Sequence, residues 1–391
     1  MRLLGFISSL TYVSALRMFS SSRLFSSAVA APAAATAAGG SCSVLERKQA
    51  ALTGLFIADA VASPVHWMYD LRQLKADYGT ITGYVKPKAK FAGSILNLSN
   101  TGGGGRGSDQ GSIIGDVINH GKKEYWGRGL NNHYHGTLDA GENTLEAQLV
   151  RVLLRTMSAK GAAFTLDDFR NDYITFMRTP GSHNDTYAST AHRQFFANLV
   201  KGAAPSECQD NDGHNTDAID ALTLVVPIIL KFADLPRKEL HQKVISTINV
   251  TRRTRALDRY AMALADLMVE VLKGKPLRAA IEQVGEAYFQ GSVASMVSAE
   301  RGDPMVACYI DSSFPALLHF AYKYSDSPEA AVLASANAGG ENVARGSVLG
   351  ALMGCAHGMS GWPAWSLSGL KERDAIQSEI GAFLSPDHSS L

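Results

Sequence analysis

Four glycines recur at every fourth position near the carboxyl end of the chain, at Gly346, Gly350, Gly354 and Gly358. On an α-helix this spacing places all four on one face. Each glycine costs a helix about 1 kcal/mol relative to alanine, so such a run needs a compensating contact. We therefore predict a helix over Arg345–Gly358 whose glycine face packs tightly against another helix in the core.

Helical periodicity dominates from Leu45 onward, apart from an irregular stretch at about Tyr78–Asn143, and alternating β-branched segments joined by tight turns are absent. Six further helices are predicted: Leu45–Val61, Asn143–Met157, a segment capped by Thr165 that runs to Met177, Arg255–Leu272, Ser312–Tyr324 and Pro328–Ala336. Another apolar helix, Asp217–Leu230, contains Pro227, which should kink it. The predicted fold class is all-α.

The first 42 residues differ from the remainder, since they contain arginines and many serines, and the first acidic residue is Glu46. This composition is typical of a transit peptide for a mitochondrion or plastid. A secretory signal is the alternative, because Leu3–Val13 is apolar, and a tail without structure is another. We predict a targeting leader at 1–42, cleaved or disordered, followed by a single helical domain at 43–391.

Charge and cysteine content exclude several classes of protein. The chain has 37 Lys and Arg against 36 Asp and Glu, a formal net charge of +1. A nucleic-acid binder normally has a clear basic excess, and a membrane-surface protein has a polybasic segment. An apolar run of about 20 residues, which a membrane span needs, does not occur. The four cysteines are far apart, which disfavours a zinc cluster or a disulfide framework.

A polar loop precedes the glycine-spaced helix and contains Gly339, Gly340, Glu341 and Asn342. A glycine pair followed by a carboxylate and an amide at a helix N-terminus suits contacts with a polar ligand. Simple capping of the helix by Asn342 or Glu341 is the alternative. The glycine run Thr101–Ser108 lacks the ending of a P-loop, so a plain loop is favoured there over a phosphate cradle.

Four segments resemble the motifs of the ADP-ribosylglycohydrolase family. The family's final Asn-x-Gly-Gly-Asp-x-Asp-Thr motif, which leads into a glycine-spaced helix, is similar to Asn337–Ala344. Its first motif, Gly-Asp-Ala-Leu-Gly-x-Pro, resembles Ala58–Pro64, and its Thr-Asp-Asp-Thr helix start falls on Gly141–Thr144. A polar turn before a proline-containing helix resembles Asn211–Asn215. The order and spacing of these segments agree over about residues 46–360.

The resemblance implies a compact orthogonal helical bundle with a cleft where these loops converge. It also implies hydrolysis of an ADP-ribosyl or related N-/O-glycosidic bond, on a small-molecule or protein-linked ligand, assisted by two Mg²⁺ ions. Glu142 and Glu341 are then the catalytic candidates, as metal ligands or as an acid–base pair. The implied metal ligands are Asp59, Glu142, Asn143, Thr144 and Glu341. The predicted ligand-binding residues are Asp59, His66, Asn143, Thr144, His183, Asp185, Asn215, Gly339, Gly340 and Asn342.

The chain departs from the family at the metal ligands. Val343 and Ala344 replace an aspartate and a threonine, Asn143 replaces an aspartate, and His66 stands where a glutamate often follows the first motif. Mg²⁺ prefers hard, charged oxygen ligands, so these changes predict weaker binding, of one ion or of none. The pattern is similar to a divergent branch of the family that includes jellyfish lens crystallins, in which the fold has a structural role.

Two functions therefore remain open, an organellar hydrolase and a catalytically inactive binding or structural protein of the same fold. An unrelated all-α binding protein would require the motif order to be a coincidence. His135, His214 and His357 are further candidates for acid–base chemistry near neutral pH, although a single histidine is more often structural. The sequence leaves the substrate, the number of metal ions and the oligomeric state open.

Overall fold

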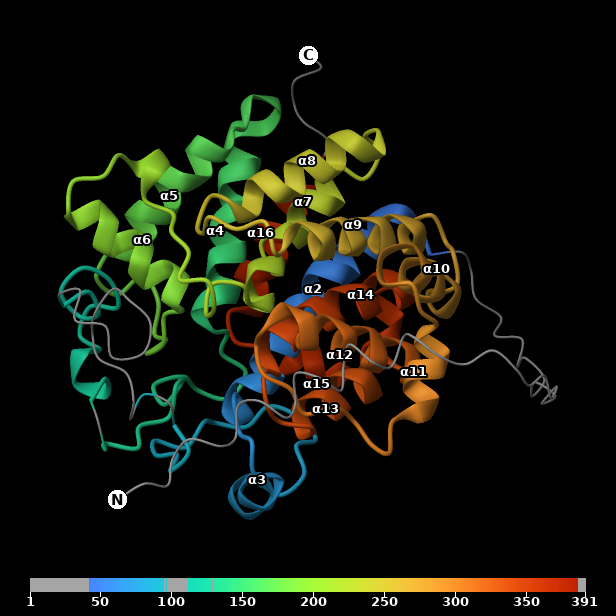
Figure 1. The fold of residues 1–391 in the computed structure, drawn as a ribbon, viewed down its shortest axis with the longest axis horizontal. Coiled ribbons are helices and arrows are strands. Elements are labelled where there is room, and N and C mark those ends of the chain that lie inside the picture. The colour runs from blue at the N-terminus through green and yellow to red at the C-terminus, as the bar shows by residue number, and fades with distance from the viewer. Residues whose placement is uncertain (1–41, 95, 97–111, 128, 386–391) are drawn as a thin grey trace.

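The computed structural model describes residues 42–94, 96, 112–127 and 129–385 (Figure 1). These residues form helices and loops with four isolated β-bridges and no strand, which confirms the predicted all-α class. The predicted leader, apart from Cys42, and the glycine run Thr101–Ser108 lie outside the described residues.

The helices of the described part follow in chain order. They are α2 (Val44–Ala62), α3 (Leu71–Tyr78), α4 (Leu145–Lys160), α5 (Leu166–Arg178), α6 (Thr190–Val200), α7 (Val225–Lys231), α8 (Arg237–Ile248), α9 (Asp258–Leu272), α10 (Leu277–Phe289), α11 (Val293–Ala299), α12 (Ile310–Lys323), α13 (Pro328–Asn337), α14 (Val343–His357), α15 (Ala364–Ser368) and α16 (Arg373–Leu384). None of them is long and apolar enough to cross a membrane.

Helices α2 and α14 lie antiparallel in the centre of the molecule, and glycines allow their backbones to touch (Figure 1). A Cβ atom added to Gly350 would lie 2.1 Å from the carbonyl oxygen of Gly54. One added to Gly354 would lie 2.1 Å from the carbonyl oxygen of Ala50. Only glycine fits at such distances, so the predicted close packing of the glycine face is observed.

The fourth glycine has a different role from the one predicted. Gly358 ends α14 instead of lying on its face, and its φ of 69° is in the left-handed region that favours glycine. Gly346 is also less crowded, because the nearest atom to an added Cβ is the Ala58 oxygen at 3.4 Å. The short contact between the two helices therefore depends mainly on Gly350, Gly354 and their neighbours on α2.

Most predicted helices are present, with ends shifted by a few residues. The capping box at Thr165 and Asp168 is observed at the start of α5. The predicted kink at Pro227 is wrong, because a 3₁₀ turn over Ile219–Leu222 comes first and α7 begins only at Val225. Pro227 thus occupies the first turn of α7, where a missing N–H leaves no intrahelical hydrogen bond unmade.

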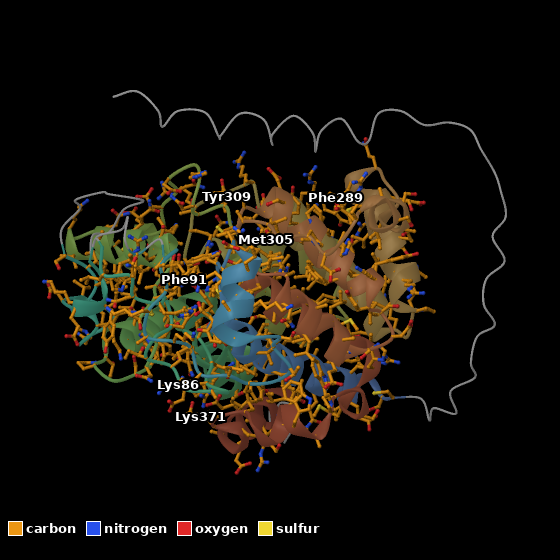
Figure 2. The ribbon with its side chains drawn as sticks, turned by 90° about the horizontal axis from the view of Figure 1, so that it is seen from below. Lys86, Phe91, Phe289, Met305, Tyr309 and Lys371 are labelled. Atoms are coloured by element: carbon orange, nitrogen blue, oxygen red, sulfur yellow. The ribbon has the colours of Figure 1, made fainter. Side chains whose placement is uncertain are left out.

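The remaining helices surround this central pair. Helix α14 also packs against α9, α12 and α13, while α16 packs against α2 and α4. In Figure 2, side chains fill the space between the helices, and Lys86 and Lys371 lie close together at the surface. Both lysines donate to the Asp139 carboxylate, at 2.8 and 2.5 Å respectively, and so join the segment before α4 to the segment before α16.

Gly350→Ala should lower the free energy of unfolding by roughly 1–3 kcal/mol or more, because the new Cβ meets backbone that cannot move without displacing α2. Gly346→Ala is the matched control on the same helix. It removes a glycine penalty without a severe contact, so its effect should range from neutral to a gain of about 1 kcal/mol. Denaturant unfolding of both variants measures the difference, and equal losses would contradict the packing argument.

Candidate functional site

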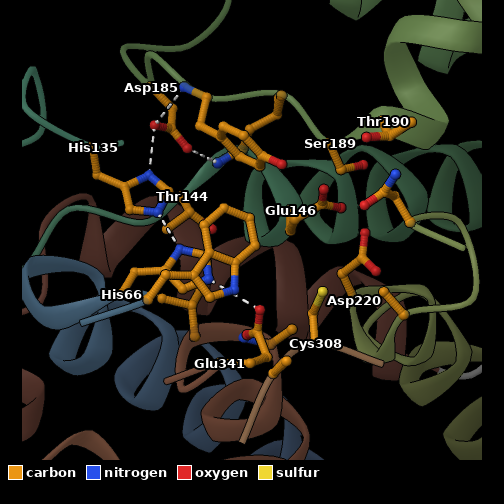
Figure 3. A pocket seen from close by; sticks show the side chains of 18 of the residues that line it. His66, His135, Thr144, Glu146, Asp185, Ser189, Thr190, Asp220, Cys308 and Glu341 are labelled. Carbon is orange, nitrogen blue, oxygen red and sulfur yellow. Dashed lines mark hydrogen bonds and ion pairs between the residues drawn. The ribbon is translucent and has the colours of Figure 1, made fainter. Parts of the chain in front are cut away.

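A cavity of about 250 Å³ lies where the end of α2, the starts of α4 and α6, and the segments before α12 and α14 meet. Figure 3 shows two groups of polar side chains around it. The first joins Asp185, His135, His66 and Glu341, and the second contains Glu146 and Asp220. The cavity thus gathers four carboxylates that are far apart in the sequence.

Two backbone constraints place Glu341 at this cavity. Gly339 and Gly340 have φ values of 66° and 64°, and a Cβ on either residue would lie within 2.4 Å of a carbonyl oxygen. The backbone of Gly340 is hydrogen bonded to both Met68 and Trp67, at 2.9 and 2.8 Å. The glycine pair therefore shapes the loop and fixes it to the segment that follows α2, and it does not line the cavity.

The Glu341 carboxylate has two partners. One contact caps the helix and the other lies at the cavity, so the two roles considered for this loop, helix capping and facing a ligand site, occur together. Its Oε1 accepts a hydrogen bond from the backbone N–H of Ala344 at 2.9 Å, which caps the start of α14. Its Oε2 lies 3.1 Å from Nε2 of His66. Glu341 is thus a helix-capping residue that also faces the cavity.

A chain of hydrogen bonds continues from His66 across one wall of the cavity. Nδ1 of His66 lies 2.7 Å from Nε2 of His135, and Nδ1 of His135 lies 2.8 Å from Oδ1 of Asp185. The two imidazole rings are nearly coplanar, with an interplanar angle of 6°. All four residues of this chain are buried, so Asp185 and Glu341 are bridged by two histidines without intervening solvent.

The charge states of this histidine chain follow from its surroundings. Burial acts to raise the pKa of Asp185, but the neighbouring His135 outweighs it and leaves the pKa below its ordinary value. Burial likewise opposes ionisation of Glu341, and His66 outweighs it, so that the pKa of Glu341 is also lowered. Burial lowers the pKa of His66 despite the adjacent Glu341 carboxylate. Both carboxyl groups are therefore ionised near neutral pH.

Asp59 lies behind the cavity and is fully buried. Its Oδ1 accepts hydrogen bonds from the Thr144 backbone N–H at 2.8 Å and the Asn143 side-chain amide at 2.9 Å. Its Oδ2 accepts one from the Thr144 hydroxyl at 2.7 Å. Asn143 also donates to the carbonyl oxygen of Phe56 at 2.7 Å. These contacts join α2 to the start of α4, so Asp59 and Asn143 have a structural role, and of the three residues only Thr144 reaches the cavity.

The predicted catalytic pair, Glu142 and Glu341, is not brought together. Glu142 lies before α4 and lines a second, polar cavity with His183, whereas Glu341 lines the first. Oε2 of Glu142 accepts a hydrogen bond from the Asp139 backbone N–H at 2.8 Å. Helix α4 begins only at Leu145, so Glu142 lies in the loop before it. A residue before a helix faces a different direction from the residues of its first turn, and this separates Glu142 from Glu341.

The other predicted residues have varied positions. Asn215 lines the first cavity, whereas Asn342 is buried and its amide donates to the carbonyl oxygens of Val65 and Ala336. His214 stacks on Tyr309 with ring centroids 4.4 Å apart, and His357 is bonded to the Ser325 carbonyl oxygen at 2.7 Å. Of the three histidines proposed for acid–base chemistry, His135 alone lines the first cavity.

The second carboxylate group, Glu146 and Asp220, was missed by the sequence analysis. Glu146 belongs to the first turn of α4, and both of its oxygens are bonded to Nε2 of His192, at 3.1 and 3.2 Å. Asp220 receives two hydrogen bonds from the Arg252 guanidinium, each of 3.0 Å. Asp220 is the one acidic residue in the apolar run 218–230, and this was the available signal, because a buried carboxylate needs a partner.

The donor set does not fit the two Mg²⁺ ions that the resemblance implies. Asp59, Asn143 and Glu142 do not line the cavity, and both oxygens of Glu341 already accept hydrogen bonds. Val343 and Ala344 form an apolar part of its wall. Among the described residues no cluster of three or more His, Cys, Asp or Glu is suited to holding a metal ion.

The fold and the site define an all-α helical bundle with a cavity lined by carboxylates. The ADP-ribosylglycohydrolase family model matches residues 41–387, and the chain belongs to this family. A solved structure titled "ADP-ribosylglycohydrolase-related protein complex" has a TM-score of 0.58 at 16% identity, and the match covers 87% of this chain and 98% of that one. That similarity shows the fold. None of the curated proteins compared with the chain matches it.

Asp59→Asn should change how stability depends on pH. Burial raises the pKa of Asp59 from 3.8 to about 6, so the folded state binds the extra proton in that interval and Asp59 destabilises the protein as the pH rises through it. This rise in the pKa of Asp59 corresponds to a loss of roughly 3 kcal/mol in the free energy of unfolding once the pH exceeds about 6. Asparagine keeps the acceptor for Asn143 and the Thr144 N–H, and its amide can donate to the Thr144 hydroxyl.

Urea unfolding of both proteins across this pH range checks the prediction. The variant should gain stability relative to the native chain as the pH increases to about 6, and the difference should then level off. Thr165→Ser, at the exposed cap of α5, is the control and should show a constant difference. A difference for Asp59→Asn that does not vary with pH would contradict the predicted protonation.

Proposed function

We propose that this chain hydrolyses an ADP-ribosyl or related N-/O-glycosidic bond in the cavity between α4 and α14. The observation that carries the proposal is the pair of carboxylates formed by Glu146 and Asp220 on one side of this cavity (Figure 3). Glycosidic bonds are cleaved by two carboxyl groups, of which one is ionised and the other donates a proton. The family acts on substrates of the ADP-ribose type, which supports the ligand class.

Glu146 suits the role of the ionised group. Burial acts to raise the pKa of Glu146, but His192 and Arg252 outweigh it, so the pKa lies below its ordinary value. His192 is held in place by the Tyr173 hydroxyl, which lies 2.8 Å from its Nδ1. This arrangement orients the imidazole toward Glu146. The carboxylate can then stabilise the positive charge that develops on the sugar ring, or accept a proton from water.

Asp220 suits the role of the proton donor. Its burial raises the pKa, Arg252 lowers it, and the nearby Glu146 carboxylate raises it further, so that the pKa lies above its ordinary value. Two carboxyl groups whose surroundings move their pKa values in opposite directions are typical of a general acid and its ionised partner. Arg252, which is 1% exposed, also fixes the orientation of Asp220 through both guanidinium contacts.

Glu146→Gln and Asp220→Asn should each reduce the rate of hydrolysis of an ADP-ribosylated substrate by at least roughly 100-fold, because each removes a proton-transfer or charge-stabilising group. Glu142→Gln is the matched control, since Glu142 precedes the same helix but lines the second cavity. It should retain turnover. Release of ADP-ribose from protein-linked and small-molecule substrates is measured for all three. Loss of turnover in Glu142→Gln alone would favour the pair inferred from sequence.

A second function, ligand binding without turnover, is favoured by the hydrogen bonds that already occupy both oxygens of Glu341, Glu146 and Asp220. Ligand would then be held without chemistry. In that case free ADP-ribose should raise the unfolding temperature of the native chain, while ADP-ribosylated substrates remain intact. Turnover that is lost in Glu146→Gln would exclude this alternative, and a structural role would give neither turnover nor a temperature shift.

A further inference from the structure

The histidine chain Asp185–His135–His66–Glu341 contains a definite number of protons. Each hydrogen bond needs one, and the three contacts of 2.8, 2.7 and 3.1 Å are all of hydrogen-bond length. A carboxylate can only accept, so the outer ring nitrogens, Nδ1 of His135 and Nε2 of His66, each carry a proton. The inner contact between the rings needs a third.

Two neutral imidazoles would supply only two protons to these three contacts. The inner contact would then bring two lone pairs within 2.7 Å of each other. With both carboxyl groups ionised, three protons on four ring nitrogens make one ring an imidazolium. The whole chain of four side chains carries a net charge of −1.

The positive ring is His135. The contact of His135 with Asp185, at 2.8 Å, is shorter than that of His66 with Glu341, at 3.1 Å, as expected where the donor ring is charged, so His66 is the neutral ring and accepts through Nδ1. His135 then donates through both nitrogens, to His66 and to Asp185. Asp185 is the better anionic partner, because it also receives the backbone N–H groups of Leu145 at 2.8 Å and Tyr187 at 3.2 Å.

We propose that the hydrogen-bonded pair His66–His135 takes the place of the family's metal ions, and that this chain folds without Mg²⁺. The pair supplies the positive charge that two buried carboxylates require, Asp185 at 1% and Glu341 at 2% exposure. It does so at the position of Glu341, where the last family motif would contribute a metal ligand. The inference concerns the charge of the site and does not depend on whether the chain is a hydrolase.

Magnesium would compete poorly for this position. To bind Asp185 and Glu341 it would have to break the hydrogen bonds at both ends of the chain and displace a proton. The groups that contact these two carboxylates within the chain are imidazole nitrogens, whereas Mg²⁺ prefers oxygen ligands in octahedral geometry. The apolar side chains of Val343 and Ala344, which also line the cavity, add no ligand.

The first experiment uses the native full-length chain and nuclear magnetic resonance after ¹⁵N labelling of histidine. We expect one histidine with both ring nitrogens protonated and one N–H proton far downfield of the ordinary imidazole range, in EDTA and in millimolar MgCl₂ alike. His66→Gln should abolish this signal, while His214→Gln, outside the chain of hydrogen bonds, should leave it unchanged. A native spectrum without such a proton would overturn the proposal.

The second experiment measures unfolding temperature with MgCl₂ and with EDTA. The native chain should unfold at the same temperature in both, whereas His66→Glu, which places a second carboxylate beside Glu341, should be stabilised by Mg²⁺. A rise in the native unfolding temperature with Mg²⁺ would overturn the proposal, as would a folded His66→Glu chain without a response. If that variant does not fold, the native protein decides. Neither readout uses turnover, so the proposed hydrolysis can fail separately.

Discussion

The backbone contact between α2 and α14 is the constraint on which the rest of the structure depends. Because the helices are antiparallel, the carboxyl end of α2 and the amino end of α14 lie at the same end of the pair. His66 follows the first and Glu341 precedes the second, so packing at Gly350 and Gly54 also determines a 3.1 Å contact between side chains 275 positions apart. A change in the helix contact would therefore alter the chemistry of the site.

The buried carboxylates around this pair are neutralised in different ways, and the difference indicates their roles. Asp59 receives only neutral donors, from Asn143 and Thr144, and burial keeps its pKa high. Such a group joins α2 to the start of α4 and does not line the cavity. Asp220 receives two hydrogen bonds from the permanent cation of Arg252, although its burial still leaves its pKa above the ordinary value. Glu341 is paired with His66. The charge of a histidine depends on its neighbours, so the net charge on this side of the cavity can change with its surroundings.

Local patterns were predictable from sequence, whereas the contacts of the site were not. The glycine spacing and the capping box at Thr165 act within one helix or one helix pair, so their physical reason is present in the sequence. The choice of Glu142 over Glu146 failed because it depends on where α4 begins, and helix ends are the least certain feature of a sequence prediction. The contact between His66 and His135 joins different segments through tertiary structure alone, so no local pattern signals it.

The replacement of charged ligands by apolar side chains need not disrupt the family fold if the charges of the site change together. An ion site without its aspartates would leave a cation without ligands, and aspartates without the ion would repel one another. Here Val343 and Ala344 remove ligand groups, while His66 adds a hydrogen-bonding ring beside Glu341. When a site loses anionic ligands it also needs less positive charge, so its net charge remains small. The same helical bundle can then keep a polar cavity without a bound metal ion.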